Sequence, residues 1–221
     1  MSTNTTALTE GSVTASGEIV RYTYKERLCH WTNGATYLFC LCTGLAFYSP
    51  YLYWLSVVGG GPATARMLHP WAGVFFYLSV VWMHTMWKQQ MGPIPEDQQW
   101  KDKIKDYVEN NDDALPPQGR FNAGQKLFYW VMYYGALVLL ASGILMWFPE
   151  KWRALHGLMS FIIPLHTAAA LATIAAFIIH LYMGLLMVTG GLDGITRGTV
   201  SKEWAAHHHR LWYDKIKQSN K

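Results

Sequence analysis

The nine histidines of this 221-residue chain are the side chains best suited to chemistry. His166 and His180 lie in one apolar stretch, and on an α-helix they would share a face and stand ~21 Å apart, about four turns. His30 and His69 stand near the starts of two other apolar stretches. Imidazole can hold a haem iron, bind a metal ion or relay protons. The elements that position these four histidines therefore decide which chemistry is available.

The composition indicates that much of the chain lies away from water. Hydrophobic residues make up 51% and Asp, Glu, Lys and Arg only 14%, against roughly 25% charged residues in a soluble domain. This pattern argues against a soluble enzyme and against an intrinsically disordered protein. Three cysteines cannot form a disulfide framework. A net charge of +4 gives no reason to expect a nucleic-acid partner.

Four segments lack Asp, Glu, Lys and Arg, and each is long enough for a membrane span of about 20 residues. They are Leu28–Ala65, Met67–Trp87, Leu127–Pro149 and Ala154–Leu192. They predict an all-α, integral membrane four-helix bundle with transmembrane helices at about residues 32–55, 70–90, 124–148 and 160–188. A large soluble helical core is the alternative, which four such segments in one short chain disfavour.

The basic residues predict the orientation of this bundle. Of the 18 Lys and Arg residues, all but three lie before the first helix, between the second and third, or after the fourth. Because cytoplasmic loops carry the excess of basic residues, both termini and the 91–123 connection are expected to be cytoplasmic. The chain is therefore expected to be a multi-pass protein of the bacterial inner (cytoplasmic) membrane.

The remaining segments predict three further regions. Residues 1–20 are rich in Ser, Thr and Gly without a basic residue, so we expect a loose N-terminal tail rather than a signal peptide. Residues 21–200 form the transmembrane domain. Within it, Asp97–Glu109 has apolar residues at helical spacing and predicts a short amphipathic cytoplasmic helix. Residues 201–221 mix aromatic and basic residues and predict a cytoplasmic or interfacial tail, against lipid or a partner.

The alternating directions of the helices pair the four histidines by depth. The first helix runs outward and the second runs back, so His30 is at the inner face and His69 at the outer face. The fourth helix starts outside, which places His166 at the outer level and His180 at the inner level. Two facing imidazoles at one depth can hold a haem iron from both sides. The sequence has no Cys-x-x-Cys-His, so two non-covalent b haems are predicted.

Other interpretations of the histidines stay open. Each could be a hydrogen-bonded helix contact, or part of a proton or ion path, although such paths usually also have intramembrane Asp or Glu. His84 and His156 are rival haem ligands. The His207–His209 patch could be solvated, interfacial or a weak metal site. Cys40 and Cys42 are expected to pack within the first helix.

A quinone site is expected where the chain enters the third helix from the cytoplasm. Asn122 and Gln125 could hydrogen-bond a quinone carbonyl, and the helix N-terminus would favour negative charge on a quinone. Gly124 leaves room for a close approach. Asn-x-x-Gln also has the spacing of a capping box, so both side chains could instead satisfy free backbone N–H groups. The two interpretations are compatible.

Six motifs occur in order along residues 21–217. They are Glu26-Arg27-Leu28-Cys29-His30-Trp31-Thr32, Leu68-His69-Pro70, Asn122-Ala123-Gly124-Gln125-Lys126, Leu165-His166-Thr167-Ala168-Ala169, Ile179-His180-Leu181-Tyr182-Met183 and the Trp204–Tyr213 stretch. Together they resemble the cytochrome b (gamma) subunit of membrane-bound formate dehydrogenase. The N-terminal extension, His84 and the third tail histidine depart from that pattern, and none of them removes a ligand.

The resemblance implies a fold, cofactors and partners. It implies four transmembrane helices, an outer haem b on His69 and His166, and an inner haem b on His30 and His180. It also implies a quinone pocket at Asn122, Gly124, Gln125 and the neighbourhood of His180. Electrons from formate would pass through a molybdenum catalytic subunit and an iron–sulfur subunit, then through the outer and inner haems to quinone. The chain itself would perform no chemistry on formate.

Two other functions fit parts of the same pattern. One is the cytochrome b subunit of a membrane nickel–iron hydrogenase, which has a different electron donor. The other is a haem-free membrane anchor or a His-lined transporter.

Overall fold

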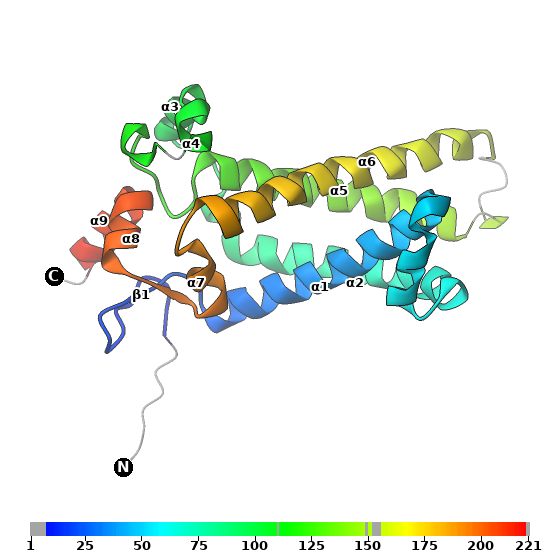
Figure 1. Cartoon of the computed structure of the whole chain (residues 1–221), viewed down its shortest axis with the longest axis horizontal. Coiled ribbons are helices and arrows are strands. Elements are labelled where there is room, and N and C mark those ends of the chain that lie inside the picture. The colour runs from blue at the N-terminus through cyan, green and yellow to red at the C-terminus, as the bar shows by residue number, and fades with distance from the viewer. Residues whose placement is uncertain (1–7, 110, 149, 152–155, 220–221) are drawn as a thin grey trace, which may run out of the picture. The chain divides into compact units, whose positions relative to one another are not determined.

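The computed structural model describes residues 8–109, 111–148, 150–151 and 156–219. The long helices of the described residues correspond to the four predicted ones and are α1 (Tyr24–Tyr48), α2 (Pro62–Trp87), α5 (Ala123–Trp147) and α6 (His156–Tyr182) (Figure 1). The helix predicted over 124–148 coincides almost completely with α5. The helix predicted over 160–188 corresponds to α6 and the π-helical segment that continues it, η5 (Met183–Met187).

Short elements make up most of the rest. The 3₁₀ segments are η1 (Pro50–Gly59), η2 (Lys88–Gln90) and η3 (Asp112–Ala114); the short helices are α3 (Pro95–Asp102), α4 (Ile104–Val108), α7 (Gly191–Thr196), α8 (Lys202–His208) and α9 (Arg210–Ser219). Two short strands, β1 (Ile19–Val20) and β2 (Thr199–Val200), pair antiparallel, with Ile19 opposite Val200.

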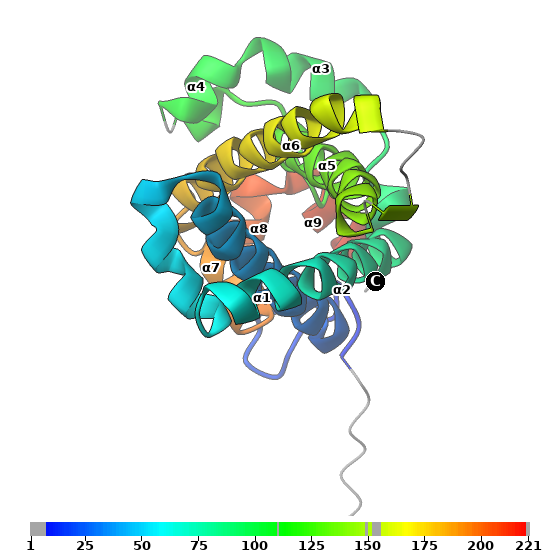
Figure 2. The ribbon, with the colours of Figure 1, turned by 90° about the vertical axis from the view of Figure 1, so that its right-hand side faces the viewer.

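The chain forms two compact units. The bundle unit comprises residues 29–86 and 129–179, which hold most of the four long helices; the terminal unit comprises the described residues up to 28, residues 87–128 and the residues from 180 onward. Within the bundle unit, Figure 2 shows the four long helices nearly end on and arranged around a common centre.

The core of the bundle unit is aromatic and tightly packed. Tyr37 of α1 is buried, and its ring centroid lies 5.4 Å from that of Phe76 and 5.1 Å from that of Phe177. Its hydroxyl also donates a hydrogen bond to Thr173 (3.3 Å). A Cβ at Gly135 of α5 would stand 2.5 Å from the Thr173 methyl carbon. Only glycine therefore allows α5 and α6 to approach this closely.

Two helices expose long apolar surfaces. Among the described residues, α5 and the 157–187 part of α6 and η5 are the helices long and apolar enough to cross a membrane, with mean hydropathies of 1.7 and 2.1. Only 22% and 11% of those stretches are buried within the protein. A core helix of a soluble protein would be mostly covered, so these surfaces fit contact with lipid. For α1 and α2 a membrane span stays a prediction.

The helix α1 begins at Tyr24, well before the predicted start at residue 32. Thr23 and Glu26 form a capping box, in which the Thr23 N–H donates to the Glu26 carboxylate (2.8 Å) and the Glu26 N–H donates to the Thr23 hydroxyl (3.4 Å). Two free backbone N–H groups are thereby satisfied, so the helix starts in the polar segment before the apolar one.

The structure differs from the loose tail expected over residues 1–20. In its described part, residues 8–20 fold onto the terminal unit: β1 pairs with β2, and Ile19 is 1% exposed in a cluster with Trp212 and Ile216. The Trp212 indole N–H also donates to the Glu10 carboxylate. Burial of these apolar side chains outweighs the loop-forming composition of the segment. Residues 1–7 lie outside the described residues.

Two other expectations are modified in the terminal unit. The single helix predicted over Asp97–Glu109 is two helices, because α3 starts at Pro95 and ends before Lys103, where α4 follows. The tail predicted over 201–221 forms α8 and α9. In α9, Trp212 and Ile216 are buried within the terminal unit. These two apolar side chains are therefore covered by the chain itself, not by lipid or a partner.

Candidate functional site

A cavity of about 290 Å³ lies within the bundle unit and is lined by all four of its long helices. Its walls are mostly apolar. His69 of α2 and His166 of α6 both line it, as do Gly44 of α1 and Gly143 of α5. The structure thus brings together the two histidines that are predicted to lie at the outer level.

The neighbouring helix holds His69 in one orientation. Nδ1 of His69 lies 2.7 Å from the hydroxyl of Thr43, which donates its only proton to the carbonyl of Phe39 at 2.7 Å. The hydroxyl therefore accepts from His69, and the proton of the neutral ring is on Nδ1. That tautomer leaves the lone pair of Nε2 for a metal.

His166 is held in the same way by a different helix. Its Nδ1 lies 2.8 Å from the hydroxyl of Ser142, which donates to the carbonyl of Val138 at 2.6 Å. The ring is therefore also in the Nδ1–H tautomer, with the Nε2 lone pair available. Both rings are therefore in the tautomer whose Nε2 can bind a metal.

Glycines follow both hydroxyl residues. A Cβ at Gly44 would stand 3.4 Å from Cε1 of His69, and a Cβ at Gly143 would stand 3.5 Å from Cε1 of His166. A Cβ at Gly73, which also lines the cavity, would meet nothing within 4 Å. An apolar cavity with glycine in its walls and two imidazoles in the metal-binding tautomer fits a non-covalent haem.

The predicted inner pair is divided between the two units. His30 belongs to the bundle unit, where its ring stands edge-on to that of Trp31 at 5.3 Å. His180 belongs to the terminal unit, and its ring stacks on that of Phe128, with centroids 4.4 Å apart and planes 5° apart. The pairing of His30 with His180 stays a prediction.

The rival ligand His84 lies in an aromatic cluster of the bundle unit. Its Nδ1 is hydrogen-bonded to the hydroxyl of Tyr129, and its ring stacks on that of Tyr133 with a centroid distance of 4.5 Å. His84 is not among the residues that line the cavity with His69. The side chain of His156, the other rival, lies outside the described residues.

The predicted quinone residues form the capping box of α5. The Asn122 N–H donates to Gln125 Oε1 (3.0 Å), and the Gln125 N–H donates to Asn122 Oδ1 (2.8 Å). The amide oxygens are therefore directed at the backbone, and the NH₂ groups remain as donors. A Cβ at Gly124 would stand 2.8 Å from Cη2 of Trp100. The space beside Gly124 is thus occupied by the Trp100 indole of α3.

The tail histidines are not one solvated patch. His209 is 2% exposed, and its Nδ1 donates to the carbonyl of Gly119 (2.7 Å) while its Nε2 accepts from the Arg21 guanidinium (2.9 Å). Burial lowers the pKa of His209 well below 6.5, and Arg21 lowers it further. Only His207 of the three is exposed. Within the described ranges, no group of three or more His, Cys, Asp or Glu side chains could hold a metal ion.

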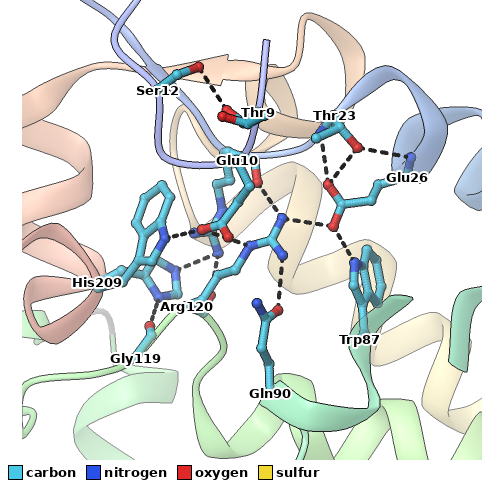
Figure 3. A network of polar contacts seen from close by, with 12 residues as sticks. Thr9, Glu10, Ser12, Thr23, Glu26, Trp87, Gln90, Gly119, Arg120 and His209 are labelled. Carbon is cyan, nitrogen blue, oxygen red and sulfur yellow. Dashed lines mark hydrogen bonds and ion pairs between the residues drawn. The ribbon is translucent and has the colours of Figure 1, made fainter. Parts of the chain in front are cut away.

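A buried charged network in the terminal unit was not anticipated from the sequence (Figure 3). The Arg120 guanidinium donates to Glu26 (2.9 Å), to Gln90 (2.9 Å) and to the backbone carbonyl of Arg21 (2.6 Å). Trp87 Nε1 also donates to the Glu26 carboxylate (2.6 Å). The network joins the N-terminal segment to the chain around residues 87–120.

These contacts leave Glu26 ionised. Burial alone would raise the pKa of Glu26, but Arg120 and the hydrogen bonds from Thr23 and Trp87 together lower it below its ordinary value. Arg120 and Glu26 have side chains 6% and 8% exposed, so they form a buried ion pair. The pair connects the first turn of α1 to the residues just before α5.

Long apolar helices with exposed surfaces, around a cavity flanked by two imidazoles in the metal-binding tautomer, have the features of a membrane cytochrome b. Residues 21–198 match the sequence profile of the family described as prokaryotic cytochrome b561. The chain belongs to this family, which is one of membrane electron-transfer cytochromes that contain haem b.

Similar proteins in other bacteria are subunits of formate dehydrogenases. The chain is 31% identical over 202 residues to the cytochrome b556(Fdn) subunit of nitrate-inducible formate dehydrogenase from Escherichia coli (strain K12), with 91% of this chain and 93% of that protein covered. It is 32% identical over 208 residues to the cytochrome b556(fdo) subunit from the same strain, covering 91% and 94%. It is 29% identical over 197 residues to the formate dehydrogenase cytochrome b556 subunit of Haemophilus influenzae, covering 88% and 82%.

Proposed function

We propose that this chain is the membrane anchor of a formate dehydrogenase complex and carries electrons from an iron–sulfur subunit through two b haems to quinone. Relatives that are formate dehydrogenase cytochrome b subunits, similar over nearly their whole length, support this assignment. The family supports the haem b. Formate would be oxidised on a separate molybdenum subunit, and this chain would transfer only electrons.

The outer haem site is His69 and His166. Bound haem supplies one-electron transfer at its iron. The two rings would bind it from α2 and α6 through Nε2, while apolar side chains of the cavity exclude water. Thr43 and Ser142 bind Nδ1 of the two rings and so leave each Nε2 available to the iron.

The inner haem would be bound by His30 and His180. This pairing rests on the alternating helix directions and on the spacing of His166 and His180 along α6. Phe128 stacks on His180 and would fix the plane of its ring.

Quinone would bind near the N-terminus of α5. The capping box directs the oxygens of Asn122 and Gln125 at the backbone, so their NH₂ groups are the donors for a quinone carbonyl. Reduction of quinone takes two electrons and two protons. With both termini and the 91–123 connection in the cytoplasm, uptake of those protons from the cytoplasm and oxidation of formate outside would build a membrane potential.

The cavity shared by His69 and His166 is the observation that carries this proposal, and haem content tests it. The experiment purifies the complex and records a reduced-minus-oxidised visible spectrum together with haem per complex. His69→Ala and His166→Ala are each expected to lose one of two b haems, and His180→Ala the other. The matched control His84→Ala, also an intramembrane histidine of α2, is expected to keep both. Loss of haem in the control with retention in His69→Ala would overturn the ligand assignment.

The identity of the electron donor is tested by the subunits that copurify. A molybdenum subunit and an iron–sulfur subunit are expected with the tagged chain. A nickel-containing subunit instead would assign the chain to a hydrogenase. The absence of any b-type α band would point to a haem-free anchor or transporter.

A further inference from the structure

The two histidines of the cavity are supported by the same kind of dipeptide, a hydroxyl residue followed by glycine, on two different helices. Thr43-Gly44 of α1 lies against His69, and Ser142-Gly143 of α5 lies against His166. In each case the hydroxyl meets Nδ1 and the glycine lies beside Cε1. The arrangement therefore occurs twice, once for each imidazole.

We infer that Thr43 and Ser142 are positioning residues that lock His69 and His166 in the Nδ1–H tautomer and thereby set the reduction potential of the outer haem. This inference rests on the proposed function, because it assumes that the two imidazoles hold iron.

The hydrogen-bond geometry fixes the direction of each bond. A serine or threonine hydroxyl has one proton. Thr43 donates it to the Phe39 carbonyl at 2.7 Å, and Ser142 donates its own to the Val138 carbonyl at 2.6 Å. Toward the imidazole each hydroxyl can therefore only accept. The backbone of the neighbouring helix dictates which ring nitrogen has the proton.

Because both hydroxyls are buried, water cannot take over their role in setting the tautomer. Thr43 is 0% exposed and Ser142 is 2% exposed, so bulk water has no access to replace either hydroxyl. Without its hydroxyl, the buried Nδ1–H of His69 would lose its acceptor, and the other tautomer would carry its proton on Nε2, the nitrogen that has to bind iron. A methyl group at the same place would fill the volume but accept nothing.

The bond also changes the electron density at the ligating nitrogen. An acceptor at Nδ1–H makes Nε2 a stronger donor to iron. A stronger donor favours the ferric state over the ferrous state and lowers the potential. Two such bonds would act on one iron, one through each histidine. Removing one is expected to shift the ferric-to-ferrous affinity ratio by about tenfold, which corresponds to a rise of ~59 mV for a one-electron couple.

The test compares Thr43→Val, which keeps the volume and removes the hydroxyl, with Thr43→Ser, which keeps the hydroxyl. Ser142→Ala is the corresponding change for the other ligand. Each variant is made in the full-length chain within the intact complex. Redox titration of the α band and low-temperature EPR of the low-spin ferric haems are the measurements. We expect two haems in every variant, a raised potential for one haem in Thr43→Val and in Ser142→Ala, and a nearly wild-type value in Thr43→Ser.

The outcomes separate this inference from the proposed function. Unchanged potentials and EPR g-values in both hydroxyl-free variants, with two haems bound, would overturn the inference and leave the haem assignment intact. If instead His69→Ala keeps both haems, the proposed function itself fails. If Thr43→Val loses the outer haem, retention in Thr43→Ser supports a requirement for the hydroxyl, whereas loss in both variants contradicts it.

Discussion

Replacing Glu26 by Gln should destabilise the terminal unit more than any exposed charge change. The carboxylate pairs with Arg120 at 2.9 Å and accepts from Trp87 at 2.6 Å, with both partners buried. Removing one partner of a buried ion pair costs about 3–5 kcal/mol. Glu10 stays 3.6 Å from Arg120 and compensates part of the charge. The lower end, ~3 kcal/mol, is therefore expected.

This loss converts to a shift in melting temperature. At about 2–4 °C per kcal/mol for a chain of this size, Glu26→Gln should melt roughly 6–12 °C below the wild type. Thermal unfolding in detergent, followed by near-UV circular dichroism, measures it, because the buried tryptophans of the terminal unit, Trp87 among them, contribute to that signal. The control is Glu109→Gln, which breaks an exposed pair with Lys105 and should cost less than ~1 kcal/mol.

The ion pair of Glu26 and Arg120 also predicts how the stability of the protein depends on pH. The pKa of Glu26 is lowered from its ordinary value of 4.5 in the folded chain, so the unfolded chain takes up a proton first as the pH falls. The stabilisation is fully present above pH 4.5 and is lost as the pH falls below that value. Glu26→Gln should flatten this acid limb. A melting temperature within ~2 °C of the wild type, or an unchanged acid limb, would refute the reasoning.

Three further predictions concern the terminal unit. The wild type should lose stability as the pH falls below 6.5, because at position 209 only the unfolded chain takes up a proton there, and His209→Asn should reduce this loss. Melting curves between pH 7.5 and 5 measure it. An unchanged dependence of melting temperature on pH would count against a buried neutral His209. Gly124→Ala should displace the Trp100 indole and cost about 1–3 kcal/mol, visible as a lower melting temperature and altered tryptophan fluorescence; a silent substitution would contradict the close approach. Lys126→Met should cost about 3–5 kcal/mol by leaving the buried Asp97 unpaired, and Lys126→Met combined with Asp97→Asn should recover part of that loss.

The long helices could be predicted because their signal is local. The absence of charged residues over a segment long enough to cross a membrane predicts both ends of α5 to within one residue. The predicted start of α1 lies too late in the sequence, because hydropathy alone does not detect the polar capping box formed by Thr23 and Glu26. That box has a sequence signature, Thr-x-x-Glu, which could have extended the helix.

The hydroxyl contacts of His69 and His166 could not be predicted, since they depend on how one helix is rotated against the next. Thr43 meets a histidine on α2, and Ser142 meets one on α6. A Thr-Gly or Ser-Gly dipeptide within a span is a weak signal, and only the packed bundle shows which face it presents. The burial of His209 was equally inaccessible, because its partners Gly119 and Arg21 are 90 and 188 residues away in sequence.

The network around Arg21 also constrains when the terminal unit can close during synthesis. Arg21 exchanges hydrogen bonds with Arg120, 99 residues later, and also bonds to His209, 188 residues later. Because synthesis proceeds from the N-terminus, all four long helices are made before His209 is. The terminal unit therefore cannot close completely until His209 has been synthesised, and truncation before residue 209 would leave the buried Arg21 guanidinium without this partner.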